Sequence, residues 1–430
     1  MKQTIFGFLL LLVVQSVAGQ KQPAYQESAS VFFDEIKAAT KKRSDLWNSN
    51  LYGAILLVDP QTRQVFANET DAGNSLTLSG KVYSGVLPDS VNIANTSVSW
   101  GGKSWAMIML PLPENKQDRI NLLAHELFHK AQPSLGFVLF NTENNHLDQK
   151  DGRIYLRLEL EALKKALESS SKKQARVHLT NAFIFRKYRH SLYTGSDSTE
   201  NLLELNEGIA EFTGAMVSGR TAKQATGHFV NGIDSFFTNP TFVRSFAYFT
   251  TPVYGYLLSR NNKNWHKEIT LKTDLTNYFI AAFNLKLPED LKGDISALVE
   301  YYNGKTIISE ETAREEKTKQ LIAAYKLKFI EQPHLEVQFV RMNISFDPRN
   351  IMPIEDQGTV YPNMRVTDVW GVLTVENGVL MSPNWDKVSL TNPTTSDGRQ
   401  LTGDGWTLEL TQGYRAEKDQ STGNYRLVKE

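Results

Sequence analysis

The sequence predicts an α+β fold with a mixed N-terminal sheet, a mostly helical middle and a small all-β domain at the C-terminus. Three observations predict it. Short apolar runs separated by turn residues precede residue 110, and helical patterns extend from Lys116 to about Gln332. Beyond Pro333, short β-type runs alternate with Gly, Pro, Asn and Asp. We therefore expect one domain over 20–332 and a β-rich domain over 333–430.

The first residues have the pattern of a secretory signal peptide. Lys2 is the charged region, Ile5 to Val14 is the apolar region, and Val17-Ala18-Gly19 offers small residues for cleavage. The apolar run is too short to remain as a membrane anchor. We expect a signal peptide at 1–19, no integral membrane segment after its removal, and a secreted or periplasmic protein. The chain has no cysteine, which suits a bacterial periplasm or exterior.

The segment before residue 100 is predicted to form a helix and then a series of strands. The helix is expected from Ser28 to about Trp47, and a hairpin from Leu51 to Asn68. The hairpin turns at Asp59-Pro60-Gln61-Thr62, which are favourable turn residues. Further strand-like segments follow through Val91 and Val98.

The most informative motif is His125-Glu126-Leu127-Phe128-His129, an H-E-x-x-H pattern within a predicted helix. Positions i and i+4 share a helix face, so both imidazoles can reach one tetrahedral zinc ion. Glu126 would lie beside the metal, where it can take a proton from a zinc-bound water. Apolar residues at spacings of three and four accompany the histidines, which indicates that both are at least partly buried. Asn115 supplies an N-cap and Asp118 an acidic first turn.

A catalytic zinc ion with two histidine ligands needs a third protein ligand, because its fourth position must hold water. No third histidine follows at short spacing and the chain has no cysteine, so we expect a carboxylate from another helix. Glu159 is one candidate, either as this ligand or as a group that orients a ligand, on the apolar face of a predicted helix from about Arg153 to Glu168, where a carboxylate needs a partner. An ion pair with Arg186 or Arg189, on a second predicted helix from about Lys173 to Tyr193, is the alternative.

The other candidate lies in Leu205-Asn206-Glu207-Gly208-Ile209-Ala210-Glu211-Phe212. Together with the H-E-x-x-H motif, this segment resembles the gluzincin metallopeptidases, the thermolysin and zinc-aminopeptidase group, whose downstream helix carries an N-E-x-x-x-D or N-E-G-x-A motif. The resemblance covers about residues 50–260 and implies a gluzincin-like catalytic domain with Glu207 as the third zinc ligand. It implies that Glu211 accepts the second ring proton of a zinc-bound histidine. A solvated pair of glutamates on a surface helix is the alternative.

The spacing of the two motifs departs from the pattern of the resemblance. The interval from His129 to Glu207 is much longer than in the familiar gluzincins, and the two predicted helices fill it.

The resemblance also implies a donor that stabilises negative charge developing on the substrate oxygen. Tyr248 stands where the zinc aminopeptidases have a tyrosine, although Thr251 replaces the glycine expected three residues later. Tyr254, His190 and His228 are the alternatives. Each tyrosine could instead be a core aromatic with a satisfied hydroxyl group.

A strand is predicted from Ser104 to Leu110, directly before the H-E-x-x-H helix. Gluzincins have an edge strand at this place, and an extended peptide pairs with it through backbone hydrogen bonds. The chain lacks the G-x-M-E-N motif that reads a free amino terminus in the aminopeptidases, which favours an endopeptidase-like cleft.

The C-terminal domain is predicted from short β-type runs, which fit a sandwich or an open barrel. These runs are Val337–Ile344, Met364–Trp370, Val372–Val375, Lys387–Leu390, Trp406–Leu410 and Tyr425–Val428. No catalytic or metal-ligating motif stands out among them.

The charges of the chain are balanced, with 47 Lys and Arg against 47 Asp and Glu. This balance gives no global bias toward nucleic acid or an anionic membrane, so we expect no nucleic-acid partner. The one local charge run, Glu310 to Lys319, is predicted to be the solvated face of a helix.

These patterns lead us to expect an exported zinc-dependent metallopeptidase that acts on peptide or protein substrates with Glu126 as its general base. Two alternatives stay open. The chain could be a non-catalytic binding protein on a metallopeptidase scaffold, against which the intact Glu126 speaks. It could also be a zinc hydrolase that acts on a non-protein amide, such as one in a cell wall.

Overall fold

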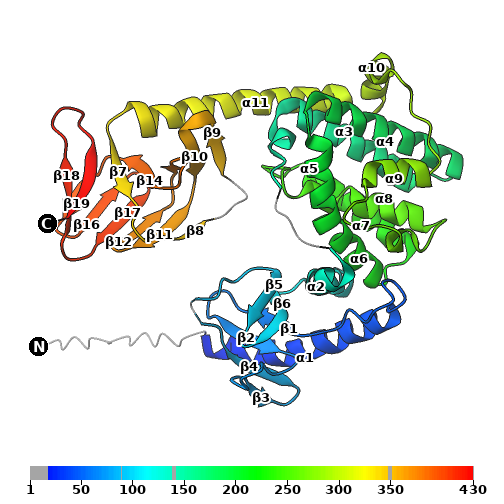
Figure 1. Cartoon of the computed structure of the whole chain (residues 1–430), viewed down its shortest axis with the longest axis horizontal. Helices are drawn as coiled ribbons and strands as arrows, with labels where there is room; N and C mark the ends of the chain where they lie inside the picture. The colour runs from blue at the N-terminus through cyan, green and yellow to red at the C-terminus, as the bar shows by residue number, and fades with distance from the viewer. Residues whose placement is uncertain (1–17, 89, 138–141, 347–350, 430) are drawn as a thin grey trace, which may run out of the picture.

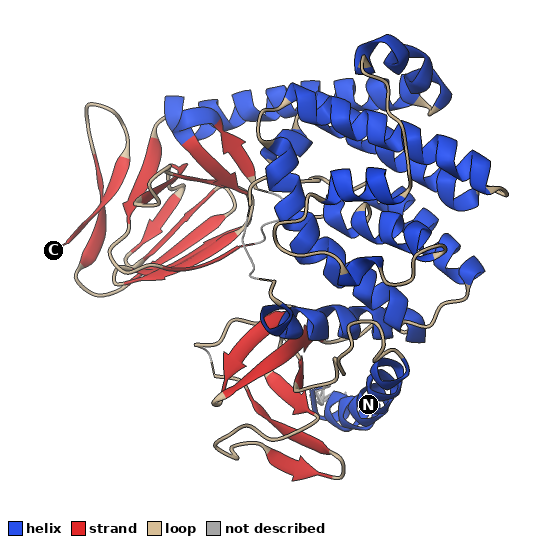
Figure 2. Ribbon diagram, turned by 45° about the vertical axis from the view of Figure 1, so that its right-hand side comes forward, coloured by secondary structure: helices blue, strands red, loops and turns tan. Residues whose placement is uncertain are grey.

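The protein was analysed as a computed structural model, which describes residues 18–88, 90–137, 142–346 and 351–429. Within these residues the fold is mixed α+β, with eleven α-helices and three sheets, as the sequence predicts. Strands are confined to the N-terminal and C-terminal parts, and helices lie between them (Figure 2). Most of the predicted signal peptide lies outside the described residues. Among the described helices, none combines the length and apolar character needed to cross a membrane.

The N-terminal part consists of helix α1 (Ala18–Lys42) and a six-stranded sheet in the order β3-β4-β2-β1-β6-β5. Its strands are β1 (Ile55–Val58), β2 (Gln64–Ala67), β3 (Thr77–Ser79), β4 (Val82–Val86), β5 (Thr96–Trp100) and β6 (Lys103–Met109). The sheet is mixed because β1 and β6 pair in parallel, whereas the other neighbours are antiparallel. Side chains alternate along β1, so that Ile55 and Leu57 join the core with α1 and α2 while Leu56 and Val58 join a smaller core on the opposite face.

The predicted hairpin at 51–68 is confirmed as β1 and β2, and the predicted strand at 104–110 is confirmed as β6, but its expected position at the edge of the sheet is wrong. Strand β6 lies inside the sheet between β1 and β5, which leaves β5 at the edge. The reason is a tight turn at Gly101 and Gly102, both with positive φ, which folds the preceding residues back onto β6. Val98 lies in β5, whereas Val91 lies in a loop.

The middle of the chain is helical, as predicted, and most of its helices share one hydrophobic core with α1 and the sheet. The α-helices are α2 (Lys116–Ala131), α3 (Lys150–Glu168), α4 (Lys172–Leu192), α5 (Ser196–Leu203), α6 (Ile209–Val217), α7 (Ala222–Phe236), α8 (Thr251–Ser259), α9 (Leu275–Ala282), α10 (Leu291–Tyr301) and α11 (Gly304–Lys326). Short 3₁₀ turns are η1 (Gln132–Leu135), η2 (Asn145–Asp148), η4 (Phe246–Tyr248) and η5 (Trp265–Lys267). Two π-helical turns are η3 (Glu204–Gly208) and η6 (Leu327–Glu331).

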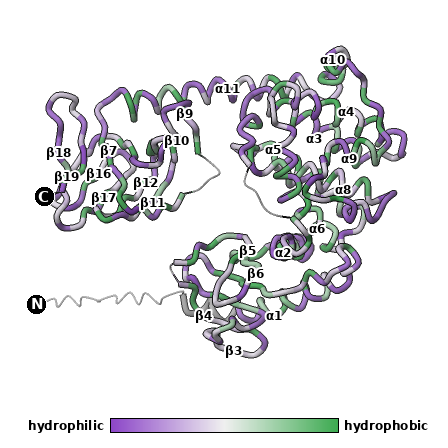
Figure 3. Tube along the Cα trace, in the orientation of Figure 1, coloured by the Kyte–Doolittle hydropathy of each residue, from purple (hydrophilic) through white to green (hydrophobic). Residues whose placement is uncertain are grey.

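Helix α11 runs from the helical part to the C-terminal β region (Figure 1). Its central turns are strongly hydrophilic (Figure 3), in agreement with the predicted charge run at 310–319. Glu311 is an exception to the predicted solvated face, because it is buried and accepts hydrogen bonds from Arg153 at 2.7 Å and Arg157 at 2.8 Å. These two ion pairs fasten α11 to α3.

The C-terminal region is all β and forms a sandwich, one of the two predicted arrangements. One sheet has the order β18-β19-β7-β14-β13-β10-β9 and the other β15-β16-β17-β12-β11-β8. The strands are β7 (His334–Gln338), β8 (Asn343–Phe346), β9 (Met352–Ile354), β10 (Gly358–Tyr361), β11 (Met364–Asp368), β12 (Gly371–Val375), β13 (Val379–Met381), β14 (Lys387–Thr391), β15 (Thr395–Asp397), β16 (Gln400–Gly403), β17 (Trp406–Leu410), β18 (Tyr414–Lys418) and β19 (Tyr425–Lys429), with a 3₁₀ turn η7 (Glu355–Gln357). Inner residues of both sheets, such as Val337 and Leu373, share one core. The predicted run 337–344 is divided between β7 and β8.

Candidate metal centre

The H-E-x-x-H segment lies on α2, which begins where the sequence predicts. The Asn115 side chain caps the helix by accepting hydrogen bonds from the backbone N–H groups of Gln117 and Asp118, at 2.8 and 3.1 Å. The helix packs its apolar residues against β6 and α6. His125, Glu126 and His129 are consequently all buried.

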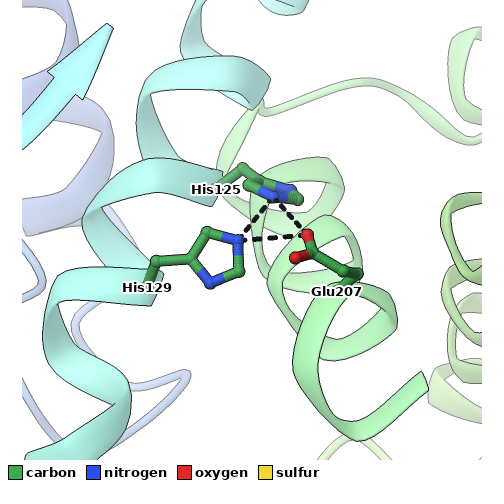
Figure 4. Close-up of side chains that lie close together, drawn as sticks. All are labelled: His125, His129 and Glu207. Carbon is green, nitrogen blue, oxygen red and sulfur yellow. Dashed lines mark hydrogen bonds and ion pairs between the residues drawn. The ribbon is translucent and has the colours of Figure 1, made fainter. Parts of the chain in front are cut away.

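The third predicted ligand, Glu207, is presented by the π-turn η3 immediately before α6. Gly208 makes this placement possible, because a Cβ atom there would lie 2.6 Å from the Thr251 side chain of α8. The wider π-turn is a feature often found at functional sites in helices. It directs Glu207 toward α2, as Figure 4 shows.

His125, His129 and Glu207 converge on one point, with ligand atoms that all lie within 4.8 Å of one another. The two histidine Nε2 atoms are 2.9 Å apart, and Glu207 Oε2 lies 3.4 Å from His125 Nε2 and 3.2 Å from His129 Nε2. Two donors bound to one zinc ion at a tetrahedral angle are about 3.3 Å apart. The observed separations are therefore close to those that a metal ion requires.

Each imidazole is oriented through its other ring nitrogen. His125 Nδ1 lies 3.0 Å from Glu211 Oε2, and His129 Nδ1 lies 2.7 Å from Gln132 Oε1. Both partners are acceptors, so each Nδ1 carries the proton and each Nε2 is left free to bind a metal. Glu211 thus accepts the second ring proton of His125.

Two residues that hold this arrangement were missed by sequence analysis. Asn121 donates a hydrogen bond to Glu211 at 2.8 Å, and Gln132 donates one to the backbone oxygen of Asn206 at 2.9 Å. Both could have been found from helical spacing, because Asn121 precedes His125 by four residues and Gln132 follows His129 by three. Gln132 therefore connects His129 to the π-turn that carries Glu207.

The charges of the site favour a cation. Burial alone would lower the pKa of His125, but hydrogen bonds to Glu207 and Glu211 outweigh it and raise that pKa to about 10. Burial would raise the pKa of Glu207, but the two histidines hold it well below its usual range. The carboxylates around His125 therefore stabilise positive charge at this position.

Glu126 lies beside the ligands without joining them. Burial raises the pKa of its carboxyl group, against the effect of the two histidines. Among the described residues, its Oε2 atom has no hydrogen-bond partner although it is fully buried. A buried carboxylate oxygen without a partner is costly, which indicates that a ligand or water meets it when the site is complete.

A cavity of about 410 Å³ opens onto this cluster. Its lining includes His125, Glu126, Glu211, His228 and Tyr248. The Tyr248 ring stacks on His125 with ring centroids 5.3 Å apart, and its hydroxyl group donates to Glu207 Oε2 at 2.6 Å. Burial, reinforced by the charge of Glu207, raises the pKa of Tyr248, so this hydroxyl remains a donor at neutral pH.

The remaining predicted alternatives lie elsewhere, except His228, which shares the cavity with Tyr248. Tyr254 donates to Glu159 at 2.9 Å, and His190 pairs with Glu200 at 3.0 Å. Neither contacts the three clustered ligands. Both belong to a buried polar network in the helical part.

Glu159 is not part of the metal-ligand cluster, because it is the centre of that network. Its two carboxylate oxygens accept hydrogen bonds from Arg186 and Arg189, both at 2.8 Å, and all three side chains are buried. Arg186 also pairs with Glu204 in the π-turn, at 2.8 Å. The ion-pair alternative for Glu159 is thus confirmed, and helices α3 and α4 form the scaffold that holds the π-turn carrying Glu207.

Comparisons of the chain with protein-family models, with curated proteins and with solved structures find no match. Any assignment of a reaction therefore rests on the residues and the geometry of the site.

Proposed function

We propose that this protein is a zinc-dependent peptidase of the gluzincin type. Its zinc ligands would be His125, His129 and Glu207. The observation that carries the proposal is the convergence of these three donors beside Glu126, whose Oε2 atom is buried without a partner. Two imidazoles and one carboxylate are a donor set typical of catalytic zinc, which keeps one position open. A zinc ion held there would polarise a substrate carbonyl group and acidify a water molecule.

The roles of the protein's own residues follow from their positions. Glu126 lines the cavity, and its carboxylate can accept the proton of the attacking water and then return it to the leaving amine nitrogen. Its raised pKa suits a group that both takes and gives a proton. Tyr248 lines the cavity, and its hydroxyl group can turn from Glu207 Oε2 to donate a hydrogen bond to the substrate oxygen as negative charge develops there.

An extended peptide is the substrate that the surroundings of the cavity suit best. Strand β5 is at the edge of the sheet, and Asn95, the residue before it, lines the cavity. A peptide could pair with the exposed edge of β5 through backbone hydrogen bonds and so pass across the metal ligands. This arrangement favours cleavage within a chain.

The test is cleavage of unfolded casein by the purified protein and by two matched variants. We expect Glu126→Gln to retain the metal and to lose activity by about 10²–10⁴-fold, because it lacks a base. Glu114→Gln, at an exposed position just before α2, should keep full activity. Removal of metal by a chelator should abolish cleavage and zinc should restore it. Equal activity of wild type and Glu126→Gln would overturn the proposal.

A further inference from the structure

A second cavity, of about 200 Å³, adjoins the first, and His228 lines both. It is formed by the ends of α1 and α6 together with α7 and α8. Its walls are partly apolar, with Phe229 from α7 and Tyr256 from α8. Three cationic side chains also line it, namely Lys42, Arg43 and Arg220, and none of its described lining residues is acidic.

The charges of Lys42 and Arg43 are neutralised less than that of Arg220. Arg220 is buried and pairs with Asp118, so it is largely compensated. Arg43 donates to the backbone oxygen of Met216 at 2.7 Å, and its nearest carboxylate, Asp45, lies at 3.7 Å with 77% of its side chain exposed. Within the described part of the chain, Lys42 takes part in no ion pair. The cavity therefore offers positive charge to an incoming anion.

This cavity is connected to the metal ligands through a continuous set of hydrogen bonds. Glu211 contacts His125 at 3.0 Å, Asn121 donates to Glu211 at 2.8 Å, and Arg220 donates to Asn121 at 2.8 Å. Asp118 pairs with Arg220 and lies 3.6 Å from His228 Nδ1. A substrate that extends past His228 would consequently bring its next groups to the cationic cavity.

We propose that this second cavity binds a carboxylate of the substrate next to an apolar or aromatic side chain, and so selects peptides with a negative charge on this side of the cleaved bond. The proposal rests on the peptidase function proposed above. The carboxylate could be the C-terminus of the chain or the side chain of an acidic residue. Both offer the same chemistry to Lys42 and Arg43.

The experiment measures binding to zinc-loaded Glu126→Gln protein, which requires no hydrolysis. The probes are N-acetylphenylalanine, the α-amide of N-acetylglutamate and N-acetylphenylalanine amide. These carry a terminal carboxylate, a side-chain carboxylate and no charge. We expect at least one carboxylate to bind about tenfold more tightly than the neutral amide, and the tighter of the two identifies the source.

Charge variants then locate the binding. Adding Lys42→Gln and Arg43→Gln should weaken the carboxylate about tenfold and leave the neutral amide unchanged. Lys42→Gln alone, an exposed change that does not threaten the fold, should weaken it about threefold. The control is Lys41→Gln, its neighbour on α1, which does not line the cavity.

Equal binding of acids and amide, or a carboxylate preference that survives these changes, would overturn the proposal. If the wild-type protein did not cleave casein while the carboxylate preference persisted, the proposed peptide hydrolysis would be contradicted and this binding site would stand.

Discussion

Each imidazole of the candidate metal centre is held by a different kind of partner, and this difference sets what each residue would contribute to metal binding. His125 is held by the charged Glu211, whereas His129 is held by the neutral Gln132. A carboxylate makes its histidine more basic, and therefore a stronger ligand, than an amide does. Glu207 contacts His129 from the side on which a metal ion would bind. Glu159, the other candidate ligand, is not available, because its two oxygens accept hydrogen bonds from Arg186 and Arg189.

Paired substitutions separate the two glutamates by function. Glu207→Gln should lower zinc affinity at least about a hundredfold, because a metal ligand is lost, and should leave the helical content intact. Glu159→Gln should keep zinc affinity within about threefold but cost about 3 kcal/mol of unfolding free energy, since it leaves buried guanidinium groups undercompensated. Zinc titration and chemical denaturation measure both. Loss of zinc from a folded Glu159→Gln protein would contradict this division.

At the level of elements, the geometry of the candidate metal centre depends on how closely α2 and α6 approach each other. The histidines come from α2, and Glu207 and Glu211 come from the π-turn and α6. Gly214 on α6 allows the contact, because a Cβ atom there would lie 2.5 Å from the backbone oxygen of Asn121. Backbone cannot move aside as a flexible side chain can, so this spacing is fixed.

Gly214→Ala should therefore push α6 away from α2. We expect a loss of about 1–3 kcal/mol of stability from overpacking and a fall of roughly tenfold in zinc affinity as the donors separate. Gly227→Ala on α7 is the matched control, because a Cβ atom there meets nothing within 4 Å. That change should be neutral or stabilise by about 0.5–1 kcal/mol. Unchanged zinc binding in Gly214→Ala would show that the helices can adjust.

The buried polar network of the helical part should also make the stability of the protein depend on pH. Burial would raise the pKa of Glu200, but Arg189 and His190 hold it well below its usual 4.5. A carboxyl group with a lowered pKa stabilises the fold above its unfolded pKa, and this contribution is lost as the pH falls below about 4.5. Denaturation curves from pH 7 to pH 3 should fall more steeply for wild type than for Glu200→Gln. Parallel curves would contradict this role.

At the level of the whole molecule, α11 both connects and stabilises the two major parts. Near its start, Glu311 is fastened to α3 by Arg153 and Arg157. Beyond its end, Phe329 packs with Ile354, Val360 and Leu380 against the seven-stranded sheet. The expected domain boundary at 332/333 lies where the secondary structure changes from helix to strand. The residues just before it nevertheless pack against the β region.

Phe329→Ala should thus destabilise the β region specifically. We expect a cost of about 3–5 kcal/mol from the cavity left behind, with zinc content and casein cleavage unchanged. Leu327→Ala in the same turn is the control, because Leu327 is 47% exposed and should cost less than about 0.5 kcal/mol. Calorimetry would show which of the thermal unfolding transitions shifts in temperature. A loss of zinc in Phe329→Ala would show that the two parts are coupled.

The sequence predicted what depends on local spacing. His125, Glu126 and His129 follow from helical periodicity, and the Asn115 cap follows from its position before α2. It could not decide between Glu159 and Glu207, because the partners of each lie far away in the chain: Arg186 and Arg189 for the first, the two histidines for the second. The prediction that the strand at 104–110 lies at the edge of the sheet was wrong for a similar reason.

The order of strands in a sheet depends on which strands pair with each other. The sequence pattern of the short β5 was too weak to show that it pairs with β6. Sequence periodicity specifies the faces of a strand, whereas its neighbours are set by tertiary packing.

The central claim is that His125, His129 and Glu207 hold one zinc ion, and anomalous diffraction at the zinc edge from crystals of the purified protein tests it most directly. We predict one strong peak within about 2.0–2.2 Å of both Nε2 atoms and of a Glu207 oxygen. A crystal without a zinc peak, or with a peak bound by other residues, would contradict the account.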